Sequence, residues 1–309
     1  MGALRYGDGP RRATRSGRGE SRQAGGIAGG MDRLRGPHRR ARRAIARIYR
    51  SRPMEAQHMQ SAPSFQNRRH HYLERSPPPG APPYPDTVWV PGGDFRLGSD
   101  RFYPEEAPVR SVEVRDFWMD RAPVTNAVFA CFVSETGYVT TAERGANSDR
   151  HRGIDPALLQ PSGLVFDAPA GVVPLNDPRR WWRFTPGASW RLPYGRPLAG
   201  VGASGHPVVQ VSHLDAHAFA EWMGKALSTE AEWEFVARGG LDGATFCWGD
   251  REIPTGGRRL ANTWQGPFPY KNSREDGYRY TSLIRSYPAN GYGLCDMTGN
   301  LWEWTADRA

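Results

Sequence analysis

The last quarter of the chain shows almost no hydrophobic periodicity, and this feature constrains the fold most strongly. From Phe246 to Ala309, turn-forming residues recur throughout, and no helical or alternating apolar pattern persists. Such a region cannot satisfy its backbone groups through regular hydrogen-bond ladders, so it needs side chains, water or metal ions. The 36 glycines and 27 prolines of the whole chain agree with a domain built largely of loops.

Positive charge is confined to the N-terminal segment. Residues 1–86 contain 18 Arg, no Lys and 6 acidic residues, which leaves 23 basic and 26 acidic residues in 87–309. The run at 38–52, HRRARRAIARIYRSR, could be a nucleic-acid patch or a basic surface helix. It lacks the interleaved aromatics of a nucleic-acid platform. We therefore expect a disordered leader or an upstream extension of the reading frame, and no nucleic-acid partner.

The proline-rich stretch at 76–85, SPPPGAPPYP, marks the clearest boundary along the chain. We expect residues 1–86 to be an Arg/Pro-rich disordered leader and linker, and 87–309 to form the globular domain. Alternation around a Gly-Gly pair predicts two strands and a tight turn in 87–100. A further strand is expected within 109–124, and a buried one at 206–212.

Three helices are predicted from their start and stop signals. The first begins after Thr125 and ends at Gly137. The second begins with Ser212 and Asp215, which are close to a capping box, and ends at Gly224. The third has a full capping box, Thr229 with Glu232, and ends at Gly239 and Gly240. Between the first two helices, residues 139–205 form a long irregular stretch whose aromatics indicate that it packs.

Several function classes are disfavoured. No apolar run is long enough for a membrane span, and no secretory signal is recognisable at the N-terminus. Cys131, Cys247 and Cys295 are odd in number and far apart, so we expect no disulfide framework and a reducing cytoplasm. His213 and His217 have a spacing that can chelate a metal, but no third ligand is apparent, which favours a solvated or core-edge pair.

Two oxygen-rich segments in the final quarter are candidates for a metal ion. Asn262 and Asp276 lie in the first segment, and Asp296, Gly299 and Glu303 lie in the second. Calcium prefers about six to eight oxygen ligands in a forgiving geometry, and glycines let the backbone bend around it. The alternative from composition is that these groups cap turns and bind one another.

Five segments, taken in order, resemble the formylglycine-generating enzyme family, also called sulfatase-modifying factors. They are VWVPGGDFRLGSD, RAPVTNAVFACFVSETGY, HPVVQVSHLDAHAFAEWMGKALSTEAEWEFVARGG, ANTWQGPFPYKNSREDGY and NGYGLCDMTGNLWEWTAD. The resemblance covers roughly residues 87–309, and TEAEWEFVARGG is its most diagnostic part. It implies an α/β (α+β) fold with little regular secondary structure, related to C-type lectins.

The resemblance also implies two calcium sites. The first would use the side chains of Asn262 and Asp276 with main-chain oxygens of Thr263 and Tyr278. The second would use the side chains of Asp296 and Glu303 with the carbonyls of Gly299 and Leu301.

The implied activity is oxidation of a cysteine in a sulfatase CxPxR motif to formylglycine, with O₂ and Cu(I) held by two cysteines. Soft thiolates suit Cu(I). We expect this catalytic pair beyond Ala309, so the 309-residue chain itself should be inactive, and we expect a monomer. None of its three cysteines has a partner nearby in sequence.

Two alternatives stay open. The chain could be a non-catalytic, calcium-stabilised lectin-like binding module of the same family. It could also resemble the enzymes that form sulfoxides on a histidine-derived thiol, but those carry an N-terminal helical domain with iron-binding histidines. Residues 1–86 show no such helical pattern.

Overall fold

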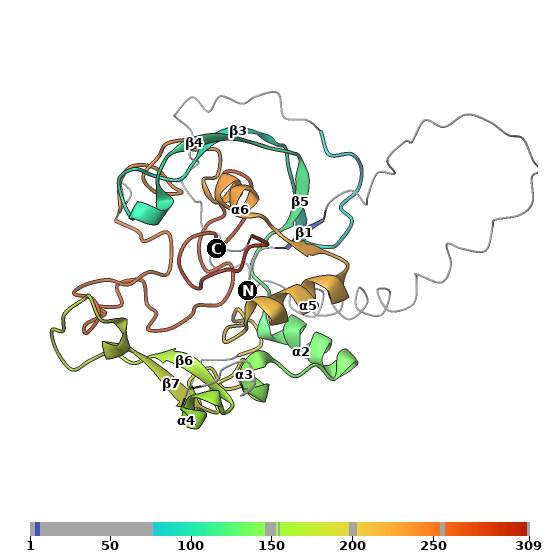
Figure 1. The fold of residues 1–309 in the computed structure, drawn as a ribbon. Helices are drawn as coiled ribbons and strands as arrows, with labels where there is room; N and C mark the ends of the chain where they lie inside the picture. Colours follow the sequence, from blue (N-terminus) through green and yellow to red (C-terminus); the bar gives the residue numbers. More distant parts are fainter. Residues whose placement is uncertain are drawn as a thin grey trace, which may run out of the picture.

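The structure is a computed structural model, and it describes residues 4–6, 77–145, 153, 155–197, 203–253 and 257–307. Short strands and helices are joined by long loops (Figure 1). In chain order the elements are β1 (Leu4–Tyr6), β2 (Thr87–Val90), β3 (Gly93–Leu97), η2 (Pro104–Glu106), β4 (Arg110–Val114), β5 (Phe117–Asp120), α2 (Asn126–Thr136), α3 (Thr141–Arg144), α4 (Pro156–Leu159), β6 (Ser162–Phe166), η4 (Pro178–Arg180), β7 (Trp182–Pro186), α5 (His213–Met223), β8 (Ala226–Leu227) and α6 (Glu230–Ala237).

Within the described residues, three small antiparallel sheets form the strand framework. The largest has the order β2-β5-β1-β8, and the other two are the pairs β3-β4 and β6-β7. The predicted strands in 87–100 are present as β2 and β3, but they do not pair with each other, because β2 joins β5 and β3 joins β4. The turn residues in the sequence indicate where each strand ends, but the strand with which it pairs lies far away in the sequence.

The prediction of one strand within 109–124 is wrong in its number, because the segment forms two strands, β4 and β5, which belong to different sheets. The chain changes sheet at Arg115 and Asp116, between the two strands. Gly92 lies directly against this crossing, since a Cβ on Gly92 would be 2.2 Å from Val114 O. The backbone at Gly92 therefore approaches the backbone after Val114 closely, and the alternating apolar pattern of 109–124 is divided into two strands at this point.

All three predicted helices are confirmed, with their N-terminal caps, although α6 ends at Ala237 with Arg238 and not a glycine as its C-cap. Thr125 accepts from Val128 N at the start of α2, and Gly137 ends it with φ +68°. The capping boxes of α5 and α6 are both formed, by Ser212 with Asp215 and by Thr229 with Glu232. These signals lie within four residues of one another, so local chemistry alone sets the helix starts.

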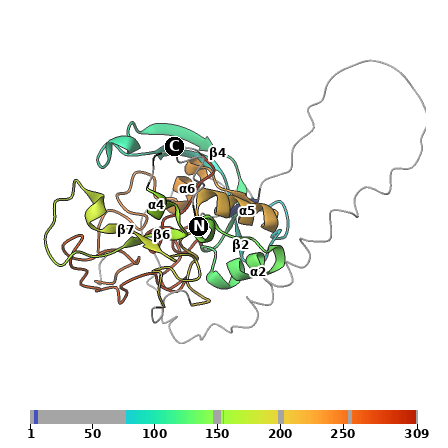
Figure 2. The same cartoon turned by 60° about the horizontal axis from the view of Figure 1, so that its bottom comes forward.

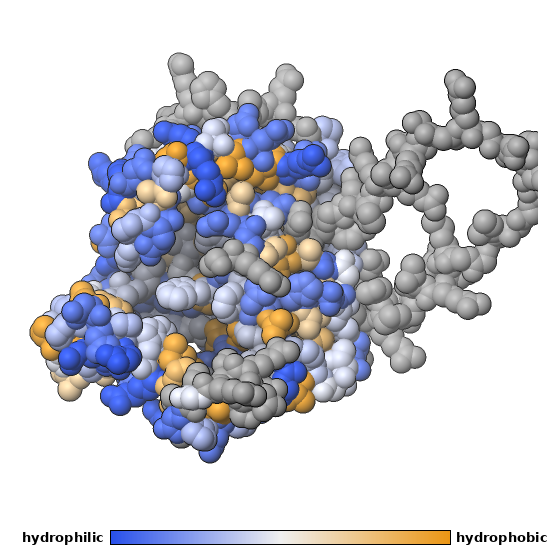
Figure 3. Space-filling view, viewed as in Figure 1, coloured by the Kyte–Doolittle hydropathy of each residue, from blue (hydrophilic) through white to orange (hydrophobic). Residues whose placement is uncertain are grey.

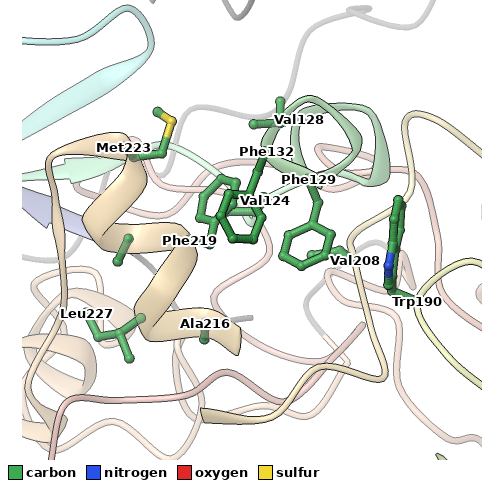
Figure 4. Packing of buried hydrophobic residues seen from close by; sticks show 11 residues of the cluster. Val124, Val128, Phe129, Phe132, Trp190, Val208, Ala216, Phe219, Met223 and Leu227 are labelled. Carbon is green, nitrogen blue, oxygen red and sulfur yellow. The ribbon is translucent and has the colours of Figure 1, made fainter. Parts of the chain in front are cut away.

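The principal hydrophobic core lies between α2 and α5 (Figure 4). Phe129 and Phe219 are fully buried, with ring centroids 5.7 Å apart, and Trp190 packs edge-on against Phe129 at 5.1 Å. The other buried members are Val124, Val128, Phe132, Val208, Ala216, Ala220, Met223 and Leu227. Burial of so much apolar side-chain area makes this half of the domain depend mainly on the hydrophobic effect.

A second core joins α6 to the sheets. Phe235 on α6 packs edge-on against Phe95 of β3, with ring centroids 5.3 Å apart. Leu294 and Met297, from the C-terminal coil, are buried in the same cluster. In Figure 1, α6 lies inside the arc formed by β3, β4 and β5. The coil is thus attached to the regular part of the domain by apolar anchors.

Two further expectations are corrected by the structure. Residues 206–212 form no named strand; Pro207 makes one isolated bridge with Thr125, and Gln210 has φ +58°. Val208 is nevertheless fully buried, as a core segment requires. The stretch 139–205 is less irregular than expected, because it contains the β6-β7 hairpin together with short helices.

The described part of the leader and linker consists of Leu4–Tyr6 and residues 77–86. Leu4–Tyr6 pairs with both β5 and β8, and Tyr84 is buried with its hydroxyl 3.3 Å from Gly224 O. The Arg-rich run 38–52 lies outside the described residues. No described helix is long and apolar enough to cross a bilayer.

The C-terminal coil, which we define as residues 246–307, matches the expectation of turns without regular elements. Within its described residues there is no named helix or strand. It lies between α6 and the β6-β7 hairpin, on the hairpin's side in the turned view (Figures 1 and 2). The face shown in Figure 3 is largely hydrophilic, with apolar residues in scattered patches.

Candidate functional site

The first predicted ligand segment folds so that its residues meet around one carboxylate. The chain from Asn262 to Tyr278, here called the first oxygen loop, returns on itself at residues 266–273. Thr263 N donates to Asp276 Oδ2 at 3.1 Å, and Tyr278 N donates to Asp276 Oδ1 at 3.0 Å. Three of the four residues predicted for this site are therefore in direct contact.

Gln265, which sequence reasoning missed, completes the first oxygen loop from inside. Its side chain is buried, and Nε2 donates to Asp276 Oδ2 at 2.8 Å and also to Thr263 O. Its Oε1 accepts from Asp276 N at 3.3 Å. The main-chain oxygen of Thr263 and a carboxylate oxygen of Asp276 thus both accept hydrogen bonds from the amide nitrogen of Gln265. Convergent oxygens of these two kinds suit a hard cation such as calcium, so the residues present fit the expected ion.

A tyrosine hydroxyl also lies beside the main chain of Asp276. The hydroxyl of Tyr287 lies 3.5 Å from Asp276 O. Burial, and next the negative charge of Asp276, raise the pKa of Tyr287. The Tyr287 phenol therefore stays neutral beside the negatively charged carboxylate.

An aromatic cluster holds the first oxygen loop against the β6-β7 hairpin. Trp264, between the two residues that contact Asp276, packs edge-on against Phe166 of β6, with ring centroids 5.4 Å apart. Phe268 packs against both rings, at 5.4 Å from Trp264 and 6.0 Å from Phe166. The loop is therefore supported by apolar contacts on one side, while Gln265 and Asp276 bind each other within it.

The second predicted ligand set does not converge in the same way. Asp296 is nearly buried, and its Oδ2 accepts from Arg285 N at 2.6 Å. Burial raises the pKa of Asp296, and the bond from Arg285 opposes that rise. Glu303 Oε2 instead accepts from Trp233 Nε1 at 2.6 Å. The two carboxylates engage different partners, so a second cation site stays a prediction.

The main-chain members of the second set are placed by tight turns. Gly299 O accepts from Leu301 N at 2.7 Å. Gly299 has φ +73°, and a Cβ there would lie 2.3 Å from Asn262 O. Only glycine fits this approach, which brings the second segment against the first.

Asn300 ties the two predicted ligand segments together, and sequence reasoning missed it. Its main-chain N–H donates to Asn262 O at 2.8 Å, and its Oδ1 accepts from Asn262 Nδ2 at 3.4 Å. Oδ1 also accepts from Ser282 N at 2.8 Å. Asn300 has φ +64°, a conformation that asparagine tolerates better than most residues, so the Gly-Asn pair was an available signal.

A charged bracket fixes the C-terminal coil to the main sheet. Asp86, just before β2, receives Arg121 Nε at 3.3 Å on one carboxylate oxygen and Arg285 Nη2 on the other. Arg121 also donates through Nη1 to Gly293 O at 2.9 Å. The bracket therefore joins the end of the proline-rich linker to the segment that carries Asp296.

Among the described residues, no group of three or more His, Cys, Asp and Glu side chains is placed to hold a metal ion. A cation in the first oxygen loop would therefore combine the single carboxylate of Asp276 with main-chain and amide oxygens. The His213 and His217 rings are 6.4 Å apart, and His213 Nε2 lies 3.1 Å from Thr305 O. This contact accounts for His213 at the edge of the core.

The three thiols occupy separate structural settings. Cys131 lies on α2, Cys247 Sγ lies 2.9 Å from the Thr298 hydroxyl, and Cys295 is buried beside Asp296. Burial is the main cause that raises the pKa of each thiol, and Glu135 and Asp296 add to it at Cys131 and Cys295. A raised thiol pKa disfavours the thiolate that soft metals and redox chemistry require.

The geometry defines a class of protein: a loop-rich α/β domain whose C-terminal coil is organised by polar side chains around convergent oxygens. Within that class, the chain belongs to the family described as the sulfatase-modifying factor enzyme 1-like domain, whose model matches residues 74–309. The mixed fold with little regular secondary structure, expected from the resemblance, is thereby confirmed.

Individual relatives include both active and inactive proteins by name. The formylglycine-generating enzyme of Mycobacterium tuberculosis is 55% identical over 220 residues, which cover 71% of this chain and 73% of that protein. The formylglycine-generating enzyme of Bos taurus is 41% identical over 236 residues, covering 74% and 60% of the two chains. The inactive C-alpha-formylglycine-generating enzyme 2 of Mus musculus is 41% identical over 229 residues, covering 72% and 68%.

Proposed function

We propose that this chain is the scaffold of a formylglycine-generating oxidase, which converts a cysteine of a sulfatase CxPxR motif to formylglycine. The observation that supports this most is the 55% identity with a protein of that name over most of the domain. The first oxygen loop supports the same proposal, because its sequence is one of the five segments that resemble the family and its side chains contact one another around Asp276. We further propose that the protein acts as a cytoplasmic monomer.

Calcium is the proposed structural ion of this scaffold. Thr263 O and an oxygen of Asp276 would bind it in the first oxygen loop, with Asn262 and Tyr278 as further oxygen donors. Asp296, Gly299, Leu301 and Glu303 would provide a second position. An ion of this kind stabilises irregular backbone by neutralising oxygens that regular structure would otherwise pair.

Copper would supply the redox chemistry when bound, since Cu(I) held by two thiolates can activate O₂ for oxidation of the substrate cysteine. The separate settings of Cys131, Cys247 and Cys295, and the raised pKa of each thiol, support the proposal that these residues are not that pair. We therefore propose that the pair is not among the 309 residues. The ion pairs of Asp86 with Arg121 and Arg285 would hold the C-terminal coil against the main sheet in such a scaffold.

The test is oxidation of a CxPxR peptide by the polypeptide that the complete reading frame encodes. With Cu(I) and O₂, we expect an aldehyde at the peptide cysteine, detected by mass spectrometry and by capture with a hydrazide. A matched peptide with serine in place of the cysteine should yield none. A reading frame that continues past codon 309 without two cysteines would contradict the oxidase assignment, as would a complete protein that forms no aldehyde.

A second candidate function is favoured by the 41% identity with an inactive relative. In this case the chain is a calcium-stabilised binding module that holds a peptide without oxidising it. Its expected signature is uptake of calcium and of the CxPxR peptide, without uptake of Cu(I). Stoichiometric Cu(I) binding by the complete protein would exclude this alternative.

A further inference from the structure

We propose that Gln265 controls cation binding in the first oxygen loop. Its amide nitrogen holds the cation position while no ion is bound, and the amide then turns so that Oε1 becomes a ligand. This inference rests on the proposed calcium site and adds a residue that the predicted ligand set lacks.

The contacts of Gln265 are those of an internal substitute for a cation. Only 2% of the residue is exposed, so solvent contributes little to its hydrogen bonding. Nε2 donates to both Thr263 O and Asp276 Oδ2, and it lies 3.4 Å from Thr263 Oγ1. One nitrogen therefore serves three oxygens of two residues that are predicted to bind calcium.

Gln265 provides the donor that Thr263 O and Asp276 Oδ2 share when no cation lies between them. Without it, a carbonyl oxygen and a carboxylate oxygen of two half-buried residues would face each other, and each would lose a hydrogen bond. Thr263 N and Tyr278 N already donate to the Asp276 carboxylate, but neither can reach across to satisfy Thr263 O in the same way. Gln265 alone bridges the two oxygens in the set of contacts described.

The same geometry requires the amide to move when a cation arrives. A positive ion between Thr263 O and Asp276 Oδ2 cannot face an N–H donor. Rotation about the last side-chain torsion exchanges the nitrogen and oxygen of an amide without moving its carbon atoms. The oxygen then points at the ion, and the bond from Asp276 N to Oε1, at 3.3 Å, is given up.

The backbone of Gln265 is fixed, so the motion is confined to the amide. Its carbonyl accepts from Ser273 N at 2.8 Å, and its N–H donates to Asn272 Oδ1 at 3.4 Å. Trp264 is held by Phe166 and Phe268 on the other side of the loop. The site is thus preformed, and one torsion separates its two states.

The substitution Gln265→Glu distinguishes the two states because it keeps the shape and replaces the donor with oxygen. In the ion-free protein three oxygens would then face one another, so the melting temperature should fall. With calcium, both glutamate oxygens are useful, because one accepts from Asp276 N while the other binds the ion. We expect calcium affinity to rise about tenfold or more, since ligand charge count tunes calcium sites.

Two further variants separate ligation from charge. Gln160→Glu makes the same change at an exposed position and should leave calcium affinity and ion-free stability unchanged. Gln265→Met removes both donor and acceptor at similar length, so it should lower ion-free stability and bind calcium more weakly than Gln265→Glu. A Gln265→Glu protein that folds only with calcium would be the strongest form of the expected result.

The measurements are calorimetric titration of the full 309-residue chain with calcium chloride, and melting curves in calcium and in EGTA. Emission of bound terbium, sensitised by Trp264, gives an independent readout of the same loop. The inference is overturned if the natural chain binds calcium but Gln265→Glu binds it no more tightly, or no more tightly than Gln265→Met. If neither the natural chain nor any variant takes up calcium or terbium, the proposed calcium site fails as well.

Discussion

The α2-α5 core and the C-terminal coil are stabilised in opposite ways. The core depends on fully buried aromatic and aliphatic side chains, with Phe129 in contact with Phe132, Trp190 and Phe219. The coil has no regular elements in its described residues, and polar side chains such as those of Gln265 and Asn300 satisfy its backbone.

This difference shows where each half of the domain is sensitive. A core stabilised by buried apolar area tolerates changes in salt or metal concentration, but it is destabilised by any substitution that removes side-chain volume. A coil built on individual hydrogen bonds responds to single polar atoms, to backbone conformation and to ions. The predictions that follow test this division, beginning with the largest expected effect.

Phe129→Ala should produce the largest loss of stability, because it empties a fully buried site. We expect the free energy of unfolding to fall by about 3–5 kcal/mol. Urea denaturation measures this loss. The matched control is Phe184→Ala. Phe184 is 58% exposed, so its replacement should lower the free energy of unfolding by about 0.5 kcal/mol or less. The Phe129 effect should be the same with and without calcium; a strong calcium dependence would break the proposed division.

Withdrawal of calcium should affect the coil and leave the core intact. At a free calcium concentration 100-fold above its dissociation constant, one bound ion stabilises by about 2.7 kcal/mol. Addition of EGTA should remove this stabilisation and lower the melting temperature. Hydrogen exchange should accelerate in residues 262–278 and remain slow in α2 and α5. Uniform acceleration across both regions would show that the coil is not a separate element of stability.

Gly299→Ala should cost about 2–3 kcal/mol, because it combines a left-handed backbone with a clash. The new Cβ would lie 2.3 Å from Asn262 O, at φ +73°. Gly187 offers a matched control with the same φ and open space around it, so Gly187→Ala should cost only about 1 kcal/mol. Thermal melts of the two variants measure the difference. Equal losses would mean that the contact between the two predicted ligand segments contributes nothing.

The smallest effect concerns pH and His206. Burial lowers the pKa of His206, whose Nδ1 lies 3.0 Å from Thr281 Oγ1. The folded state therefore binds this proton less readily than the unfolded state, and stability should fall as the pH drops below the ordinary value of 6.5. Urea midpoints of the natural chain and of His206→Gln, compared between about pH 7 and pH 5, isolate this residue. An identical pH dependence in both proteins would contradict the assignment.

The sequence predicted the helices well because their information is local. Ser212 with Asp215, and Thr229 with Glu232, each form a complete cap within four residues. The pairing of β4 and β5 with different strands could not be predicted in this way, because it depends on the distant crossing at Gly92. The β6-β7 hairpin was missed for a related reason, since its cross-strand partners lie across a long connection.

The candidate site was predicted only in part. The residues around Asp276 were identified through the family resemblance, and the structure brings Thr263 and Tyr278 to that carboxylate. Gln265 and Asn300 were not identified, because each acts through a partner that the chain brings close only after folding. Sequence spacing gives the oxygens of such a loop more readily than the donors that hold them in place.

The hydrogen bonds between Asn262 and Asn300 have a consequence for how the protein would respond to ions. Asn262 belongs to the first predicted ligand segment and Asn300 to the second, so an ion that orders one segment also restricts the other. The first ion then bears the entropic cost of ordering both segments, so the second ion would bind more tightly than the first. A protein with both positions filled should therefore take up its ions cooperatively, with few molecules carrying only one.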